Sequence, residues 1–213
     1  MKPVLSLLEG KWFPRKHVSV RDLFTPLFTV WTSSADASCH YEQFTNASAF
    51  RAAVRHAFRS NRANTIYIGA HGDRNAIHGF HDEGIKRAVI KNAFNQEKGS
   101  TKRGVYFGSC SFVHRSTAEF ILPQCPRVSW IAGYHTSVDW VDSSALDLCF
   151  FRHFLFPSPG RGKKMPNTMQ RRLIYAVNRT CTDMGPLAKR LGFHVFYRRQ
   201  GGGIADLMAD ERG

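Results

Sequence analysis

The sequence predicts an α/β protein, a three-layer α/β/α sandwich around a mainly parallel central sheet. Three short apolar runs carry this prediction: residues 65–70 (TIYIGA), 104–109 (GVYFGS) and 128–134 (VSWIAGY). They are apolar almost throughout, which is typical of strands buried on both faces of a parallel sheet. Helix-length segments separate them, as in consecutive β-α-β units.

The first part of the chain predicts two strands and a helix. Residues 4–8 form a short apolar run and predict a buried strand. Residues 20–27 predict a helix that breaks near Pro26, because proline disrupts a helix interior. Residues 27–32 (LFTVWT) are rich in β-branched and aromatic side chains, so they predict a strand.

The remaining elements alternate in the same way. Phe50, Val54 and Phe58 recur every four residues, so residues 46–59 predict an amphipathic helix with Thr45 at its start. Further helices are predicted at residues 85–94, 116–122, 143–156, 168–181 and 186–191, and further strands at 76–80 and 193–198.

Length and composition indicate one globular domain. The chain has 213 residues, 43% hydrophobic and 22% charged, with 17 Phe, and disordered chains are poor in aromatic residues. We expect a single domain over residues 1–200 and a loose tail over 201–213, which begins with three glycines. No apolar run reaches the roughly 18 residues of a membrane span, and the N-terminal segment lacks the features of a signal peptide.

Cysteine usage and charge bear on location and partners. Five cysteines without a C-x-x-C pair indicate neither a disulfide framework nor a cysteine zinc site, so we expect a reducing cytoplasm. The net charge is +14, and residues 152–199 hold eleven basic residues against one acid. Such a surface attracts polyanions. An alternative function is therefore a non-catalytic basic module that binds nucleic acid or another polyanion, although no nucleic-acid motif supports it.

A histidine and a cysteine follow two of the core strands. His71-Gly72-Asp73 comes directly after residues 65–70, and Cys110 comes directly after residues 104–109. The carboxyl ends of parallel strands gather ligands and catalytic groups, and neighbouring strands lie about 4.8 Å apart. A lone cysteine after a strand is more often a small buried hydrophobe, and a lone His-Gly is more often a turn. Together, in this order, they indicate a His71–Cys110 dyad.

The chemistry of hydrolysis suits this pair. Cysteine is a strong nucleophile once it loses its proton, and a nearby histidine can pass that proton to a leaving amine. Gly72 lets a substrate carbonyl approach the backbone. The N–H groups of Gly72 and Cys110 are therefore candidate donors of an oxyanion hole.

The pattern resembles the caspase-like, or clan CD, cysteine peptidases. Their mark is an apolar strand ending in His-Gly and a later apolar strand ending in a small residue and Cys, here residues 66–72 and 105–110. The resemblance covers about residues 1–200 and is greatest to small stand-alone bacterial proteins of this kind. It implies a caspase-haemoglobinase-like fold and a thiol protease with His71 as general acid/base and Cys110 as nucleophile, acting on a polypeptide substrate without a cofactor. The caspase signature Gln-Ala-Cys-x-Gly is absent, so a preference for Asp is not implied.

Specificity and regulation are predicted less directly. Asp73, Asp139 and Asp142 fall on loops at the expected catalytic edge, and they predict a pocket for a basic side chain of the substrate. The alternative is that each caps a turn or helix, with Asp142 as the N-cap of the helix from residue 143. By resemblance, the protein is a bacterial effector of stress or antiviral (phage) defence, activated by a signal. An anionic activator such as a nucleotide then fits the basic region 152–199.

Two other interpretations were weighed. His71, His78 and His81, followed by Asp82 and Glu83, are potential metal ligands, but their spacing matches no metal motif, so we expect no metal. A degenerate, non-catalytic scaffold of the same fold has no need of an intact His71 and Cys110.

Overall fold

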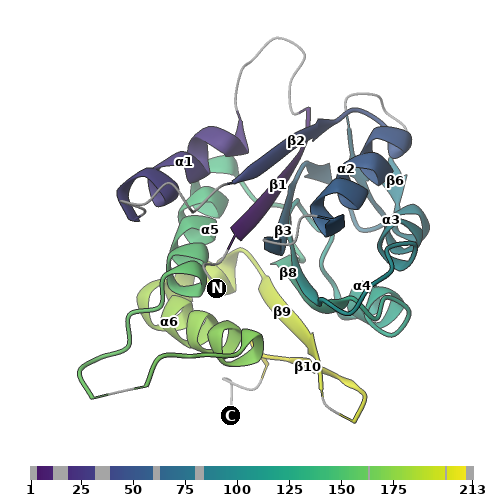
Figure 1. Cartoon of the computed structure of the whole chain (residues 1–213). Coiled ribbons are helices and arrows are strands. Elements are labelled where there is room, and N and C mark those ends of the chain that lie inside the picture. The colour runs from purple at the N-terminus through teal and green to yellow at the C-terminus, as the bar shows by residue number, and fades with distance from the viewer. Residues whose placement is uncertain are drawn as a thin grey trace.

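A seven-stranded sheet forms the centre of the molecule (Figure 1). The computed structural model describes residues 4–11, 19–31, 39–59, 63–79, 84–162, 164–199 and 201–209. The strand order is β10-β9-β8-β7-β3-β1-β2. The strands are β1 (Val4–Gly10), β2 (His40–Phe44), β3 (Ala63–Gly69), β7 (Arg103–Gly108), β8 (Val128–Tyr134), β9 (Phe193–Arg198) and β10 (Ile204–Asp206). The first five of these pair in parallel, and β9 and β10 are antiparallel, which confirms the mainly parallel sheet.

Helices cover both faces of the sheet, so the three-layer prediction is confirmed (Figure 1). One layer holds α1 (Val20–Trp31), α5 (Trp140–Leu155) and α6 (Met169–Arg190), and the other holds α2 (Ala47–Arg59), α3 (Arg87–Asn95) and α4 (Arg115–Ile121). Among the described residues, no helix has the length and apolar character needed to cross a membrane.

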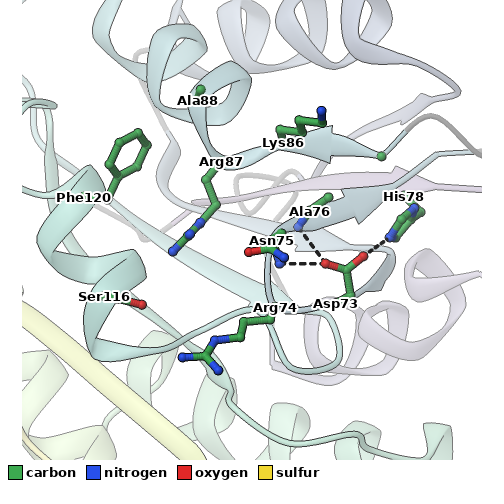
Figure 2. Close-up of a pocket in the computed structure, with 11 residues that line it drawn as sticks. Asp73, Arg74, Asn75, Ala76, His78, Lys86, Arg87, Ala88, Ser116 and Phe120 are labelled. Carbon is green, nitrogen blue, oxygen red and sulfur yellow. Dashed lines mark hydrogen bonds and ion pairs between the residues drawn. The ribbon is translucent and has the colours of Figure 1, made fainter.

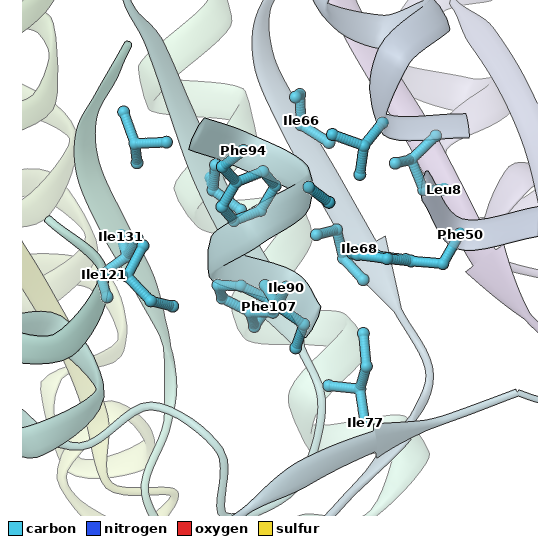
Figure 3. Packing of buried hydrophobic residues seen from close by; sticks show 14 of the residues in the cluster. Leu8, Phe50, Ile66, Ile68, Ile77, Ile90, Phe94, Phe107, Ile121 and Ile131 are labelled. Atoms are coloured by element: carbon cyan, nitrogen blue, oxygen red, sulfur yellow. The ribbon is translucent and has the colours of Figure 1, made fainter. Parts of the chain in front are cut away.

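Successive side chains along each strand point alternately to the two helical layers. Ile66, Ile68 and Phe107 point to the layer of α2, α3 and α4, where they pack with Ile90 and Phe94 of α3 (Figure 3). The intervening residues point to the other layer and include Leu7, Tyr67, Tyr106 and Trp130. Because both faces are buried, these strands are apolar nearly throughout, as the sequence indicates.

The predicted strand at residues 27–32 is wrong. Residues 27–31 continue α1, which passes through Pro26, and residue 32 lies outside the described residues. Val20, Phe24, Leu27 and Phe28 recur at helical spacing and are buried in the same core layer. Burial of this apolar stripe outweighs the β propensity of the segment and the cost of an internal proline.

Other boundaries also differ. The strand β2 was not predicted, and residues 85–86 form the short strand β6 before α3. The break predicted between helices at 168–181 and 186–191 is present as a kink at Met184 within α6. Residues 201–209 are not a loose tail, because β10 pairs with β9 and its Ala205 is buried.

A second, three-stranded sheet follows β3. It consists of β4 (His71–Gly72), β5 (Ala76–His78) and β6 (Ile85–Lys86), paired antiparallel in the order β4-β5-β6. The hairpin of β4 and β5 starts one residue after β3 ends, so it stands at the carboxyl edge of the main sheet.

Candidate active site

The register of β3 and β7 places His71 and Cys110 at corresponding points beyond the sheet. These strands are parallel neighbours, and their last paired residues are Gly69 and Gly108. His71 and Cys110 each lie two residues further on. His71 is exposed and Cys110 is half-buried.

Gly72 brings the two segments into contact. A Cβ atom placed on Gly72 would lie 2.8 Å from the carbonyl oxygen of Cys110 and 2.9 Å from the Cβ of Ser109. Both separations are below van der Waals contact, so only glycine lets the hairpin pack this closely. The His-Gly and Ser-Cys segments therefore lie side by side.

The loop after β8 encloses the other side of the thiol. The Cys110 Sγ lies 3.4 Å from the carbonyl oxygen of Val138 and 3.5 Å from its backbone nitrogen. This loop connects β8 to α5 and continues into Asp139, the N-cap of α5. The nucleophile candidate thus sits between the β4–β5 hairpin and residues 138–139.

Ser111 holds the turn after Cys110 in a strained conformation. Its φ of 54° is the only positive value at a non-glycine residue in the described part of the chain. Its N–H donates to Thr136 (2.8 Å), and its carbonyl oxygen lies 2.8 Å from Nε2 of His114. Strain of this kind persists only where surrounding contacts fix it, and it is common at functional sites.

Burial disfavours ionisation of three other thiols. Burial raises the pKa of Cys39 to about 12 and that of Cys125 to about 11, and it also raises the pKa of Cys149. A thiolate is the reactive form of cysteine, so these three side chains suit structural roles.

Asp73 is engaged within its own hairpin (Figure 2). Its carboxylate accepts hydrogen bonds from the backbone N–H groups of Asn75 (2.6 Å) and Ala76 (3.0 Å) and lies 2.7 Å from Nε2 of His78. Partial burial works to raise the pKa of Asp73, but these contacts outweigh it and lower the pKa. Asp73 therefore shapes the turn that follows His71.

Asp139 and Asp142 are engaged at the start of α5. Asp139, not Asp142, is the N-cap, and its carboxylate accepts from the N–H of Asp142 at 2.9 Å. Asp142 lies in the first turn and forms an ion pair with Arg190 of α6. The structure brings Asp139 next to Val138 at the thiol, whereas the Asp142 carboxylate is directed to Arg190.

A buried carboxylate beside the site escaped the sequence analysis. Asp147 of α5 is 2% exposed and accepts hydrogen bonds from the hydroxyls of Tyr67 (2.6 Å), Tyr106 and Tyr134 (2.5 Å). The sequence could have indicated this network, because Asp147 lies on the apolar face of a predicted helix and each of three predicted core strands contains a tyrosine. A Cβ on Gly108 would lie 2.0 Å from the Tyr67 hydroxyl, so this glycine makes room for the network directly before Ser109-Cys110.

One group of potential metal ligands lies elsewhere. Cys149, His153 and Asp183 offer ligand atoms within 4.8 Å of one another, between α5 and α6. His153 and Asp183 already pair at 2.8 Å, and Arg179 also contacts Asp183 at 3.3 Å. Of the ligand set weighed in the sequence, His81, Asp82 and Glu83 lie outside the described residues.

Comparison with known proteins identifies the fold. No protein-family model matches the chain, and no curated protein matches it in sequence. Forty chains of solved structures match it in fold. One is a secreted C11 cysteine protease from Bacteroides thetaiotaomicron, solved with an irreversible peptide inhibitor. That match has a TM-score of 0.54 and 8% identity and covers 92% of this chain and 66% of that chain.

The chain therefore has the caspase-like α/β fold of the clan CD cysteine peptidases. The chain spans just under two thirds of the protease that it matches, so the activity of that protein enters only as a proposal.

Proposed function

We propose that the protein is a cysteine endopeptidase that hydrolyses peptide bonds with a His71–Cys110 dyad. The observation that carries this proposal is the close contact between Gly72 and Cys110, at the carboxyl ends of two neighbouring parallel strands. The similarity in fold to a cysteine protease supports the same chemistry.

In the proposed reaction, the Cys110 sulfur attacks the carbonyl carbon of the scissile bond and forms a C–S bond. The proton of the thiol passes to His71, which donates it to the leaving amine as the C–N bond breaks. Water then attacks the resulting thioester, with His71 accepting a proton from the water and returning it to the sulfur. The products are a carboxylic acid, an amine and the free thiol.

The register of the hairpin supports Gly72 as an oxyanion donor. Asp73 N donates to Ala76 O at 3.0 Å, so residues 73 and 76 form a hydrogen-bonded pair of the antiparallel ladder. Hydrogen-bonded and non-hydrogen-bonded pairs alternate, which makes the next pair, Gly72 and Ile77, non-hydrogen-bonded. The Gly72 N–H then points away from β5 and is not used in the β4–β5 pairing. We propose that it binds the developing oxyanion together with the N–H of Cys110.

The geometry of the site gives less information on substrate preference and biological role. Asp73, Asp139 and Asp142 are each engaged in a turn, a cap or an ion pair, so they add no support to a pocket for a basic side chain. Activation by an anionic signal, a role in bacterial stress or phage defence, and a cytoplasmic location are predictions from the sequence alone.

Selective alkylation tests the dyad. We expect iodoacetamide to modify Cys110 faster than Cys39, Cys125 and Cys149, whose pKa values are raised by burial. His71→Ala should slow the reaction at Cys110 only, as read by mass spectrometry of tryptic peptides. In parallel, a mixed peptide library should be cleaved by the wild-type protein and not by Cys110→Ala.

Equal labelling of Cys110 and Cys125 would argue against an activated thiol. Cleavage that persists in Cys110→Ala would assign the activity to another group or a contaminant. Ser109→Ala is a matched control, because it changes the residue beside the nucleophile without removing the sulfur.

A further inference from the structure

A cavity of about 880 Å³ opens at the tip of the β4–β5 hairpin (Figure 2). One wall is the tip of the β4–β5 hairpin, residues 73–76, which begins two residues after His71. Another wall is α4, with Ser116 and Phe120, which follows the Cys110 turn. The first turn of α3, including Arg87, closes the third side. Two walls of the cavity are therefore continuations of the two catalytic segments.

Among the described residues that line this cavity, positive charge predominates. Arg74, Lys86 and Arg87 are basic, and Asp73 is the single acidic one of that described set. Figure 2 shows the guanidinium groups of Arg74 and Arg87 extending toward the side where Ser116 lies, whereas Lys86 extends away from them. Within the described ranges, neither arginine has a carboxylate at ion-pair distance, because Asp73 is turned to His78 and its own hairpin.

Arg74 is exposed, whereas Arg87 is half-buried against the cavity wall. Arg87 lies over the ring of Phe120, 6.0 Å from its centroid, and its backbone N–H donates to Asn75 at 3.1 Å. The floor includes Ala76, which is 6% exposed. These contacts hold Arg87 against the cavity wall and lower the entropy that it loses when it binds an anion.

His114 contacts the Cys110 turn and lies near Arg74 of the cavity. The His114 ring lies 2.8 Å from the Ser111 carbonyl oxygen. Burial lowers the pKa of His114, the bond to Ser111 opposes that change, and the positive charge of Arg74 adds to the lowering. Arg74 is thus close enough to this histidine for their charges to interact, which places the arginine on the same side as the nucleophile's turn.

We propose that this cavity is a substrate subsite that binds a carboxylate side chain, Asp or Glu, of the peptide, through Arg74 and Arg87. The subsite holds a residue near the scissile bond but outside the position whose carbonyl is attacked, since its walls start two or more residues beyond His71 and Cys110. An extended peptide rises about 3.3 Å per residue, so a side chain within about four residues of the cut can reach it. This inference rests on the proposed peptidase function.

Cleavage profiling tests the proposal. We map the cut sites of the wild-type protein in a mixed peptide library and expect Asp and Glu to be enriched at one position within about four residues of the scissile bond. For a preferred peptide, replacing that Glu by Gln should raise KM about tenfold with little change in kcat, since a charge-assisted hydrogen bond is lost. Arg74→Gln with Arg87→Gln should abolish the difference between the two peptides.

Two single variants calibrate this result. Arg171→Gln removes an exposed arginine of α6, on the opposite face of the sheet, and should keep the full preference for Glu. Lys86→Gln should have a smaller effect than Arg87→Gln, because its side chain extends away from the two guanidinium groups. Equal KM values for the Glu and Gln peptides in the wild-type protein, or equal loss in Arg171→Gln, would overturn the proposal.

A binding experiment tests the subsite independently of the proposed peptidase activity. The full-length Cys110→Ala protein is titrated with fluorescein-labelled Glu-rich and Gln-rich peptides, and anisotropy should show tighter binding of the Glu-rich peptide that depends on Arg74 and Arg87. If the wild-type protein cleaves nothing, the peptidase function fails while this binding still tests the subsite. If pyrophosphate binds with the same arginine dependence but Glu-rich peptides show no preference, the subsite takes a free anion and the substrate proposal is wrong.

Discussion

At the scale of single residues, two glycines determine how closely the catalytic segments pack. Gly72 lies against the Cys110 backbone, and Gly108 lies under the Tyr67 hydroxyl. In each case the neighbouring atoms are nearer than a methyl group tolerates. From the sequence, Gly72 was expected to leave space for a substrate carbonyl. In the structure, protein atoms also lie close to the Cβ position of this glycine, as they do at Gly108.

Gly72→Ala should therefore abolish the proposed peptidase activity without unfolding the protein. The new methyl group would have to displace the Cys110 carbonyl or the hairpin, and a shift of about 1 Å in a catalytic group can lower kcat by about 100-fold. Peptide cleavage and circular dichroism measure the two effects. Gly160→Ala is the matched control, because no atom lies within 4 Å of a Cβ at that position. Full activity of Gly72→Ala would show that the contact does not position the dyad.

At the scale of elements, Asp147 connects α5 to three strands of the sheet. Tyr67 of β3, Tyr106 of β7 and Tyr134 of β8 all donate to this one carboxylate. Tyr67 and Tyr106 also stack, with ring centroids 5.4 Å apart. Because β3 and β7 end just before the candidate catalytic residues, this network fixes α5 relative to the two strands that position those residues.

Tyr106→Phe should destabilise the fold. It removes a hydrogen bond to a buried charged group while preserving the ring, and such a loss costs about 1–3 kcal/mol of unfolding free energy. Urea denaturation followed by fluorescence measures the change. Tyr175→Phe is the control, since its hydroxyl accepts only a 3.2 Å bond at an exposed position. An equal effect of both variants would mean that the network adds nothing to stability.

At the scale of the whole molecule, Asp147 gives stability an unusual dependence on pH. Burial raises the pKa of Asp147 from 3.8 to about 6, although the three tyrosine hydroxyls oppose the rise. Between these two values the folded protein binds a proton that the unfolded chain releases. The free energy of unfolding should therefore fall as pH rises from about 4 to about 6, by up to about 3 kcal/mol from this group, and then level off.

Asp147→Asn isolates this contribution. Asp206 and Asp73, whose pKa values are lowered by their histidine partners and backbone N–H groups despite the opposing effect of burial, add stability as pH rises through the acid range in both proteins. The difference between wild type and Asp147→Asn cancels those groups. We expect that difference to change between pH 4 and 6 in urea titrations. A difference independent of pH would place the titration of Asp147 outside this window.

Sequence patterns predicted the parts of the fold that depend on local periodicity. The strands at residues 128–134 and 193–198 have the predicted limits, because an apolar run bounded by turn-forming residues is visible in the sequence itself. Residues 27–31 and β2 were missed, since their structure depends on the partners that cover them rather than on their own propensity. His71 and Cys110 could be proposed from the ends of their strands. The predicted pocket for a basic side chain gains no support, because Asp73 and Asp142 are engaged in local contacts that the sequence does not reveal.

The parallel register of β3 and β7 also limits how this protein can change its length. Each candidate catalytic residue stands two positions past a paired glycine, so one inserted or deleted residue at either point would turn that side chain to the opposite side of the chain. Natural variants of the molecule should therefore tolerate length changes in surface loops such as residues 157–162, but keep the spacing from Gly69 to His71 and from Gly108 to Cys110 unchanged.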